Sequence, residues 1–200
     1  MQPSILSRQA ILSLIRSNAP MQAIEHPGIP DFKWTHGSLK AAFGQHLREA
    51  GGDAHEIASV AEANAKLIEL HPKATVICSA VPEITGTRRI DKVLDPHELA
   101  DVDVGVVRAR FGVAESGAVW LTQEDLGVNA LAFLSQHLIV LLDPEQIVPY
   151  MHEAYSRVRL DATAYGCFMM GPSATADIEA TLVHGAQGPR SLNVFLLSRT

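Results

Sequence analysis

The chain has 200 residues, 47% of them hydrophobic and 19% charged, and its formal charge is −6. The apolar fraction excludes a disordered chain, and the length suits one sizeable hydrophobic core. The acidic balance argues against a nucleic-acid-binding protein, which needs a basic surface to neutralise phosphates. No run of about 18 apolar residues occurs, so we expect no membrane span. Because the N-terminus does not have the pattern of a signal peptide, we expect a cytoplasmic protein.

The N-terminal region predicts a helix followed by an extended arm. Three apolar side chains have the i, i+3, i+4 spacing of an amphipathic helix over residues 3–17: Ile11, Leu14 and Ile15. Prolines recur in residues 19–32, and proline fixes φ and removes a backbone donor. We therefore divide the chain into a helix with a proline-rich arm, residues 1–32, and an α/β domain, residues 33–200.

Two helices are expected at the start of that domain. Apolar residues recur at three- and four-residue spacing from Leu39 to Ala50, which predicts the first helix. Ser59 and Glu62 have the spacing of a capping box, which predicts the start of the second helix. This second helix is expected to end before Pro72, because proline interrupts a helix.

Apolar runs, several of them rich in β-branched residues, predict buried strands at residues 74–78, 102–107, 118–122, 137–142, 165–170 and 192–197. Two more helices are expected among them. One starts at Asp143–Gln146 and presents Ile147, Met151, Tyr155 and Val158 on its inner face; the other spans Ala174–His184. Continuous apolar strands alternating with amphipathic helices predict a mostly parallel sheet covered on both faces.

The two cysteines, Cys78 and Cys167, each lie in an apolar run. They are too few for a disulfide framework, and a cubane iron–sulfur cluster usually needs four thiolates. We therefore interpret both as small buried hydrophobic residues and expect this chain to bind no cofactor. The nine histidines have neither the spacing nor the motif of a metal site, so no metal is expected. Dinucleotide and phosphate-loop fingerprints are also absent from the sequence.

Gly112–Ala118 is the first stretch that could carry chemistry. A carboxylate, Glu115, and a hydroxyl, Ser116, lie in a glycine-flanked turn between apolar segments. Glu115 could act as a base, a nucleophile or an acceptor for a substrate hydroxyl. The alternative is a hairpin turn with a solvent-exposed glutamate.

Two further stretches follow the strand expected at residues 165–170. In Gly171–Glu179, backbone N–H groups at an expected helix start, together with the Ser173 and Thr175 hydroxyls, could bind an anion at the carboxyl ends of the strands. The alternative is an ordinary helix cap. In Gly185–Arg190, the arginine could bind a carboxylate, and the alternative is a helix stop followed by a turn.

The segment from Gly171 to Leu197 resembles the C-terminal signature of the LUD-domain family, which includes the lactate utilisation protein C group. The segment Ala114–Leu121 resembles the Ala-Glu-Thr-Gly-Thr segment of that family, and the opening Ser-Arg-Gln-Ala-Ile-Leu resembles its N-terminal helix. The similarity extends from about residue 4 to residue 198 and is most specific at the C-terminus. The resemblance implies a three-layer α/β/α sandwich like that of NagB, ribose-5-phosphate isomerase and CoA transferases, with an N-terminal helical arm.

The resemblance also implies an accessory role in the oxidation of L-lactate to pyruvate, beside two iron–sulfur partner proteins that carry the clusters. A small anionic or hydroxy-acid ligand would then lie at the carboxyl ends of the strands, with no role for nucleic acid. The expected site joins a catalytic Glu115 to ligand-binding residues from the three stretches: Ser116, Gly117, Gly171, Pro172, Ser173, Thr175, Asp177, Gly188 and Arg190.

Four positions depart from the family pattern. Ala174 stands where members usually carry arginine, and Gln187 where they carry histidine. Ser116 and Ala118 stand where they carry threonine. Two alternatives therefore stay beside the lactate role: an independent small-molecule enzyme with a CoA-transferase-like or cyclo-ligase-like fold, and a non-catalytic interaction module.

Overall fold

The computed structural model describes residues 5–19, 25, 27–93, 95–159, 161–176 and 181–199. The chain forms two units, Met1–Phe32 and Lys33–Thr200. The first unit contains helix α1 (Ile5–Ser17), whose Ile11, Leu14 and Ile15 side chains are exposed. No helix in the described part of the chain is long and apolar enough to cross a bilayer.

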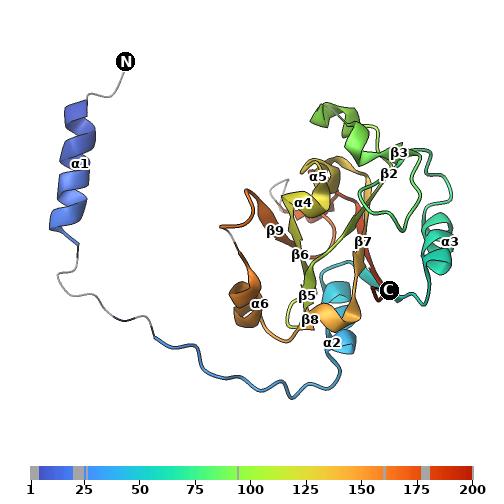
Figure 1. Ribbon diagram of the computed structural model, residues 1–200, viewed down its shortest axis with the longest axis horizontal. Coiled ribbons are helices and arrows are strands. Elements are labelled where there is room, and N and C mark those ends of the chain that lie inside the picture. The colour runs from blue at the N-terminus through green and yellow to red at the C-terminus, as the bar shows by residue number, and fades with distance from the viewer. Residues whose placement is uncertain are drawn as a thin grey trace. The chain divides into compact units, whose positions relative to one another are not determined.

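A six-stranded sheet forms the centre of the second unit, and all of its strands are parallel (Figure 1). In spatial order the strands are β1 (Asp53–Glu56), β12 (Ser191–Leu196), β7 (His137–Leu142), β4 (Val104–Arg108), β2 (Ile77–Ser79) and β3 (Arg88–Arg89). Strands β4, β7 and β12 are almost wholly buried, because side chains cover the sheet on both faces.

The two faces of the sheet pack against different helices. Along β7, Leu138 and Val140 share one core cluster with Phe43 and Leu47 of α2 (Leu39–Glu49). Ile139 and Leu141 point to the other face and join Ala63 and Leu67 of α3 (Val60–Leu70). This alternation is the two-residue period of a strand, so β7 contributes to both cores.

A second, four-stranded sheet lies in the layer that contains α2. Its order is β8 (Ile147–Val148), β5 (Phe111–Val113), β6 (Ala118–Thr122) and β9 (Gly166–Met169). β6 is antiparallel to β5 and β9, whereas β8 is parallel to β5. The sequence did not predict this sheet, and it makes the fold a layered α/β sandwich in which one outer layer is itself partly β.

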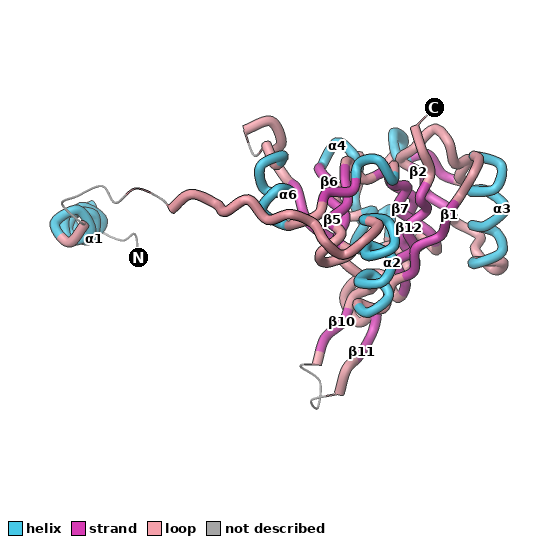
Figure 2. The backbone as a smooth tube through the Cα atoms, turned by 90° about the horizontal axis from the view of Figure 1, so that it is seen from below, coloured by secondary structure: helices cyan, strands magenta, loops and turns pink. Residues whose placement is uncertain are grey.

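The remaining elements are short. They are the helices α4 (Gln123–Leu126), α5 (Leu131–Leu134) and α6 (Met151–Arg157), and the 3₁₀ turns Ile90–Lys92, Pro96–Leu99 and Pro144–Gln146. A pair of two-residue strands, β10 (Ala174–Thr175) and β11 (Val183–His184), projects from the body of the second unit (Figure 2).

Several expected elements are confirmed, and their caps explain why. Ser38 Oγ accepts a hydrogen bond from Ala41 N, and Ser59 Oγ accepts one from Glu62 N, so both hydroxyls cap their helices. The Glu62 carboxylate accepts from Ala58 N, one residue earlier than a capping box requires. The strands expected at 118–122 and 137–142 have those bounds in the structure.

The helix expected from Asp143 is wrong in its first half. Asp143 does cap a turn, since its carboxylate accepts from Glu145 N at 3.1 Å, but that turn is a single 3₁₀ turn. The β-branched pair Ile147–Val148 then joins β5 as a strand, and α6 begins only at Met151. Sheet pairing thus overrides the local helix signal.

The helix expected over Ala174–His184 is also wrong, because its two ends form the antiparallel strands β10 and β11. The cysteines fit their interpretation more closely. Cys78 is buried in β2 and Cys167 is partly buried in β9, and burial raises the pKa of each thiol.

Candidate functional site

Glu115 lies in the hairpin turn between β5 and β6. Its backbone N–H donates to Pro149 O at 3.0 Å, and its Oε2 accepts from Met151 N at 2.8 Å. Met151 is the first residue of α6, whose own N-cap residue makes no side-chain cap. The carboxylate therefore caps α6 from a neighbouring turn.

This contact predicts the effect of two substitutions. Glu115→Ala should lower the free energy of unfolding by about 1 kcal/mol, because it removes a helix cap. Glu115→Gln should cost less, because its amide oxygen can still accept from Met151 N. Urea unfolding of the two variants and the parent protein measures the difference, and equal losses would show that the carboxyl oxygen does not cap α6.

Ser116 and Gly117 also have structural contacts. Ser116 Oγ accepts from Ala118 N at 3.3 Å, within the same turn. Gly117 has a φ of +70°, and a Cβ there would overlap the backbone of Leu47 in α2. Since Gly171 approaches the same helix at Ala50, the first two predicted stretches both contact the C-terminal half of α2.

Ser173 uses its polar groups to close the base of the β10–β11 hairpin. Its backbone N–H donates to Pro189 O at 2.9 Å, its hydroxyl donates to Gln187 O at 2.8 Å, and its carbonyl accepts from Gly185 N at 2.8 Å. Ser173 also lies against Gly188, where a Cβ would be 3.0 Å from the Ser173 Cβ. The structure thus brings the second and third predicted stretches together.

These stretches do not lie where the sequence placed them. Arg190 N donates to Gln136 O, directly before the first residues of β7 and β12, so the stretches lie at the amino ends of the parallel strands. No helix starts at Ser173, so the expected anion site at a helix N-terminus is absent there. The reason is that β9 belongs to the second sheet, so the turn after it is not at the carboxyl edge of the parallel one.

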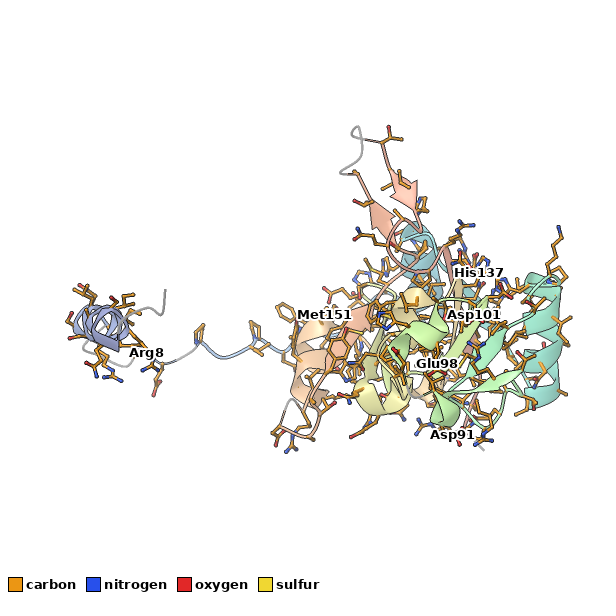
Figure 3. All side chains as sticks on the ribbon, turned by 90° about the horizontal axis from the view of Figure 1, so that it is seen from above. Arg8, Asp91, Glu98, Asp101, His137 and Met151 are labelled. Carbon is orange, nitrogen blue, oxygen red and sulfur yellow. The ribbon has the colours of Figure 1, made fainter. Side chains whose placement is uncertain are left out.

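The other predicted residues add little to that site. Pro172 contacts Gly51 at the end of α2, and Thr175 pairs with Val183 in the hairpin. Asp177 lies outside the described residues. Figure 3 shows Met151, which Glu115 caps, well apart from His137, beside which Arg190 lies. Glu115 and Arg190 therefore belong to separate places.

Two histidine rings, tilted by 30° to each other, lie at the amino ends of the parallel strands. The His71 and His137 ring centroids are 4.3 Å apart, and His137 Nδ1 is 2.8 Å from Ser191 Oγ. Burial lowers the pKa of both rings below 6.5. The charge of His137 lowers the pKa of His71 further, and the charge of Arg190 lowers the pKa of His137 further. The Asp103 carboxylate raises the pKa of His137, but by less than burial and Arg190 lower it.

The lowered pKa values predict a pH dependence of stability. Below about pH 6.5 the unfolded chain binds protons that the folded rings do not, so the free energy of unfolding should fall as the pH falls toward their folded pKa values. Urea unfolding at pH 7.5 and pH 5.5 measures this loss. His71→Phe keeps a flat ring but cannot be protonated, so it should show a smaller loss. An equal loss in this variant would contradict the prediction.

A cavity of the second unit has a volume of about 660 Å³ and lies at the carboxyl edge of the parallel sheet. Its walls come from the residues that follow β1, β2 and β12, from the end of β4, from the first turn of α3 and from α4. Ligands of open α/β sheets usually bind in this position. We call it the carboxyl-edge pocket, and it is the candidate functional site.

A partly buried ion pair forms one wall of this pocket. Arg108 Nη2 is 2.7 Å from Glu83 Oε1, with the two side chains 10% and 27% exposed. Arg108 Nη1 also donates to Leu197 O, at 3.4 Å. Arg108 Nε and Glu83 Oε2 are buried without a hydrogen-bond partner. One donor of Arg108 and one acceptor of Glu83 therefore make no hydrogen bond although the two residues form an ion pair, which is unusual for buried charged groups.

The rim carries further charges. Arg110 pairs with Glu124 and with Asp125, whose Oδ2 is 2.9 Å from Arg110 Nε. Both acids line the pocket, as does Arg199 on the exposed chain after β12. No three His, Cys, Asp or Glu side chains gather as metal ligands anywhere in the described ranges.

Glu83, Arg108 and Arg199 were not predicted from the sequence. One signal was present: Arg108 is a charged residue at the end of a run of apolar strand residues, and charged groups are seldom buried unless paired. Its partner Glu83 lies 25 residues earlier, and no motif connects the two.

Comparison with known proteins places the chain in a family. Residues 91–197 match the model of the LUD domain. Lactate utilization protein C of Oceanobacillus iheyensis is 31% identical over 93 residues, which are 44% of this chain and 40% of that protein. The protein of the same name from Bacillus pumilus is 38% identical over 90 residues, 42% of this chain and 38% of that protein. The matched segments thus span less than half of these relatives.

A solved structure shares the fold. The crystal structure of a DUF162 family protein from Deinococcus radiodurans has a TM-score of 0.63 with this chain at 19% identity. The likeness covers 83% of this chain and all of that one. The layered α/β sandwich is therefore common to both proteins.

Proposed function

The chain belongs to the LUD domain family, and on that premise we propose that it works in lactate utilisation. In this role it is an accessory subunit beside two iron–sulfur proteins that oxidise L-lactate to pyruvate. The observation that carries the proposal is the match of residues 91–197 to the LUD domain, together with relatives named lactate utilization protein C.

The proposal assigns the iron–sulfur clusters to the two partners. A cluster is held by four thiolates in most such sites. This sequence has two cysteines, which lie in different sheets, Cys78 in β2 and Cys167 in β9. Electron transfer through clusters would therefore take place outside this chain.

A growth experiment tests the role in the cell. A strain that lacks this protein should grow on glucose but poorly on L-lactate as its only carbon source, and the parent chain should restore growth. Pyruvate as carbon source is the matched control, because it enters after the proposed oxidation. Normal growth of the deletion strain on L-lactate would contradict the proposal.

A further inference from the structure

We propose that the carboxyl-edge pocket binds an organic acid that carries a hydrogen-bond donor on the carbon next to its carboxylate. The carboxylate would be held by Arg108 and by the first turn of α3. The donor, a hydroxyl or an ammonium group, would be held by Glu83. This proposal concerns binding alone and stands whether or not the chain works in lactate oxidation.

The free hydrogen-bonding capacity of the Glu83–Arg108 pair carries the argument. A guanidinium has five N–H donors, and the bonds to Glu83 Oε1 and Leu197 O use two of them. Glu83 Oε2 accepts no hydrogen bond. Leaving buried charged groups without partners is costly, so a ligand that accepts from Arg108 and donates to Glu83, once the two side chains turn these atoms toward the pocket, removes a cost that the unpaired atoms bear.

The charges around the pocket are nearly balanced. Each acidic residue in its wall already has an arginine: Glu83 has Arg108, while Glu124 and Asp125 have Arg110. Arg199 lines the pocket, and among the described residues it forms no ion pair. With Arg110 counted, three arginines face three acidic residues, so the charges nearly cancel, and the preference for an anion rests on the unused donors of Arg108 and on the first turn of α3.

The first turn of α3 adds backbone donors to the same wall. Ser59 and Val60 line the pocket, and the first N–H groups of a helix have no partner within it. α3 has 11 residues, and its N-terminus attracts negative charge, part of which the Glu62 carboxylate, bonded to Ala58 N, already supplies. Ser59 Oγ is engaged with Glu62 N, which leaves Val60 N as a donor toward a ligand.

The size and the apolar wall of the pocket suggest what else the acid carries. A volume of about 660 Å³ is in the range of sites for metabolite-sized ligands, which is about 300–1,000 Å³. Ile57, Val81 and Pro82 provide apolar surface beside the charged pair. An acid with a branched apolar side chain should thus bind more tightly than a three-carbon acid of the same headgroup.

Three acids with the same carbon chain provide the test: propionate, L-lactate and L-alanine. They differ only at the second carbon, which carries hydrogen, a hydroxyl or an ammonium group. Calorimetric titration of the full chain should show that L-lactate or L-alanine binds at least tenfold more tightly than propionate. The acid that binds more tightly of these two shows whether Glu83 prefers a hydroxyl or an ammonium donor. The branched acids 2-hydroxy-4-methylpentanoate and L-leucine should exceed their three-carbon counterparts.

Variants separate the two halves of the site. Arg108→Lys keeps the charge but loses the fork, so all carboxylates should bind at least tenfold more weakly. Val60→Pro removes one backbone donor at a helix position where proline is tolerated, so it should weaken binding while α3 stays folded. Glu83→Gln should abolish the preference over propionate. Arg159→Lys, in an exposed ion pair with Asp161, is the matched control and should leave binding unchanged.

Several results would overturn the proposal. Equal affinity for the three acids would remove the role of Glu83, and binding of inorganic phosphate in place of the acids would indicate a simple anion site. Absence of any binding at millimolar concentrations would show that the pocket does not bind acids of this class. If Arg108→Lys does not fold, then unchanged affinity in Val60→Pro still contradicts the proposal. A failed lactate growth test leaves all of these measurements unaffected.

Discussion

Replacing Gly171 by alanine is expected to lower the free energy of unfolding by about 3 kcal/mol. Gly171 has a φ of +67°, a conformation that costs a residue with a Cβ about 1–2 kcal/mol. A Cβ there would also overlap Ala50 O at the end of α2. Because backbone atoms cannot move aside as a flexible side chain can, crowding adds about 1–3 kcal/mol. Urea unfolding followed by tryptophan fluorescence measures the loss.

Gly37 provides the matched control for this substitution. It has a similar φ of +75°, but a Cβ there would meet nothing within 4 Å. Gly37→Ala should therefore show only the conformational cost, and the difference between the two variants isolates the close approach of the turn to α2. Equal losses would mean that residues 171–173 do not pack against α2 as described.

Replacing Arg108 by methionine is expected to cost about 3 kcal/mol, because the Glu83 carboxylate then stays partly buried without its partner. Glu83→Gln should also be destabilising, because it leaves the more deeply buried Arg108 guanidinium without its counter-charge, although the amide oxygen can still accept from Arg108 Nη2. The double variant should recover part of the Arg108→Met loss, because no unpaired charge remains.

A double-mutant cycle by urea unfolding measures this coupling between Arg108 and Glu83. The exposed pair Arg159–Asp161 is the control, and it should show no measurable coupling. Strictly additive losses at Arg108 and Glu83 would contradict the prediction.

The sequence predicted those elements that local signals specify. Serine caps start α2 and α3, and long apolar runs become the central strands β6 and β7. These features depend on neighbouring residues only, so composition and spacing suffice to find them. The fold class followed from the alternation of such elements.

Elements that depend on distant pairing were missed. Ile147–Val148 forms a two-residue strand because β5 offers it an edge, and Ala174–Thr175 does so because Val183–His184 lies opposite. Neither strand is long enough to show a period of two residues. The anion site expected at Ser173 failed for the same reason, since hydrogen bonds to Gln187 and Pro189 replace the helix that the site required.

Local sequence patterns could not predict the candidate site either. The carboxyl-edge pocket draws its walls from segments that span residues 57–199, and only the order of the parallel strands brings them together. Two of the predicted site residues instead stabilise the fold. Glu115 caps α6, and Ser173 closes the β10–β11 hairpin. Glycine-rich polar turns indicate structure as readily as they indicate ligands.

Reconstituted lactate oxidation tests the central claim most directly. This chain would be combined with its two candidate iron–sulfur partners, and L-lactate oxidation would be followed with an artificial electron acceptor, with and without the chain. The account predicts that pyruvate forms at a substantial rate only when all three proteins are present. Full activity of the two partners alone, or no lactate oxidation by any combination, would contradict the proposed role.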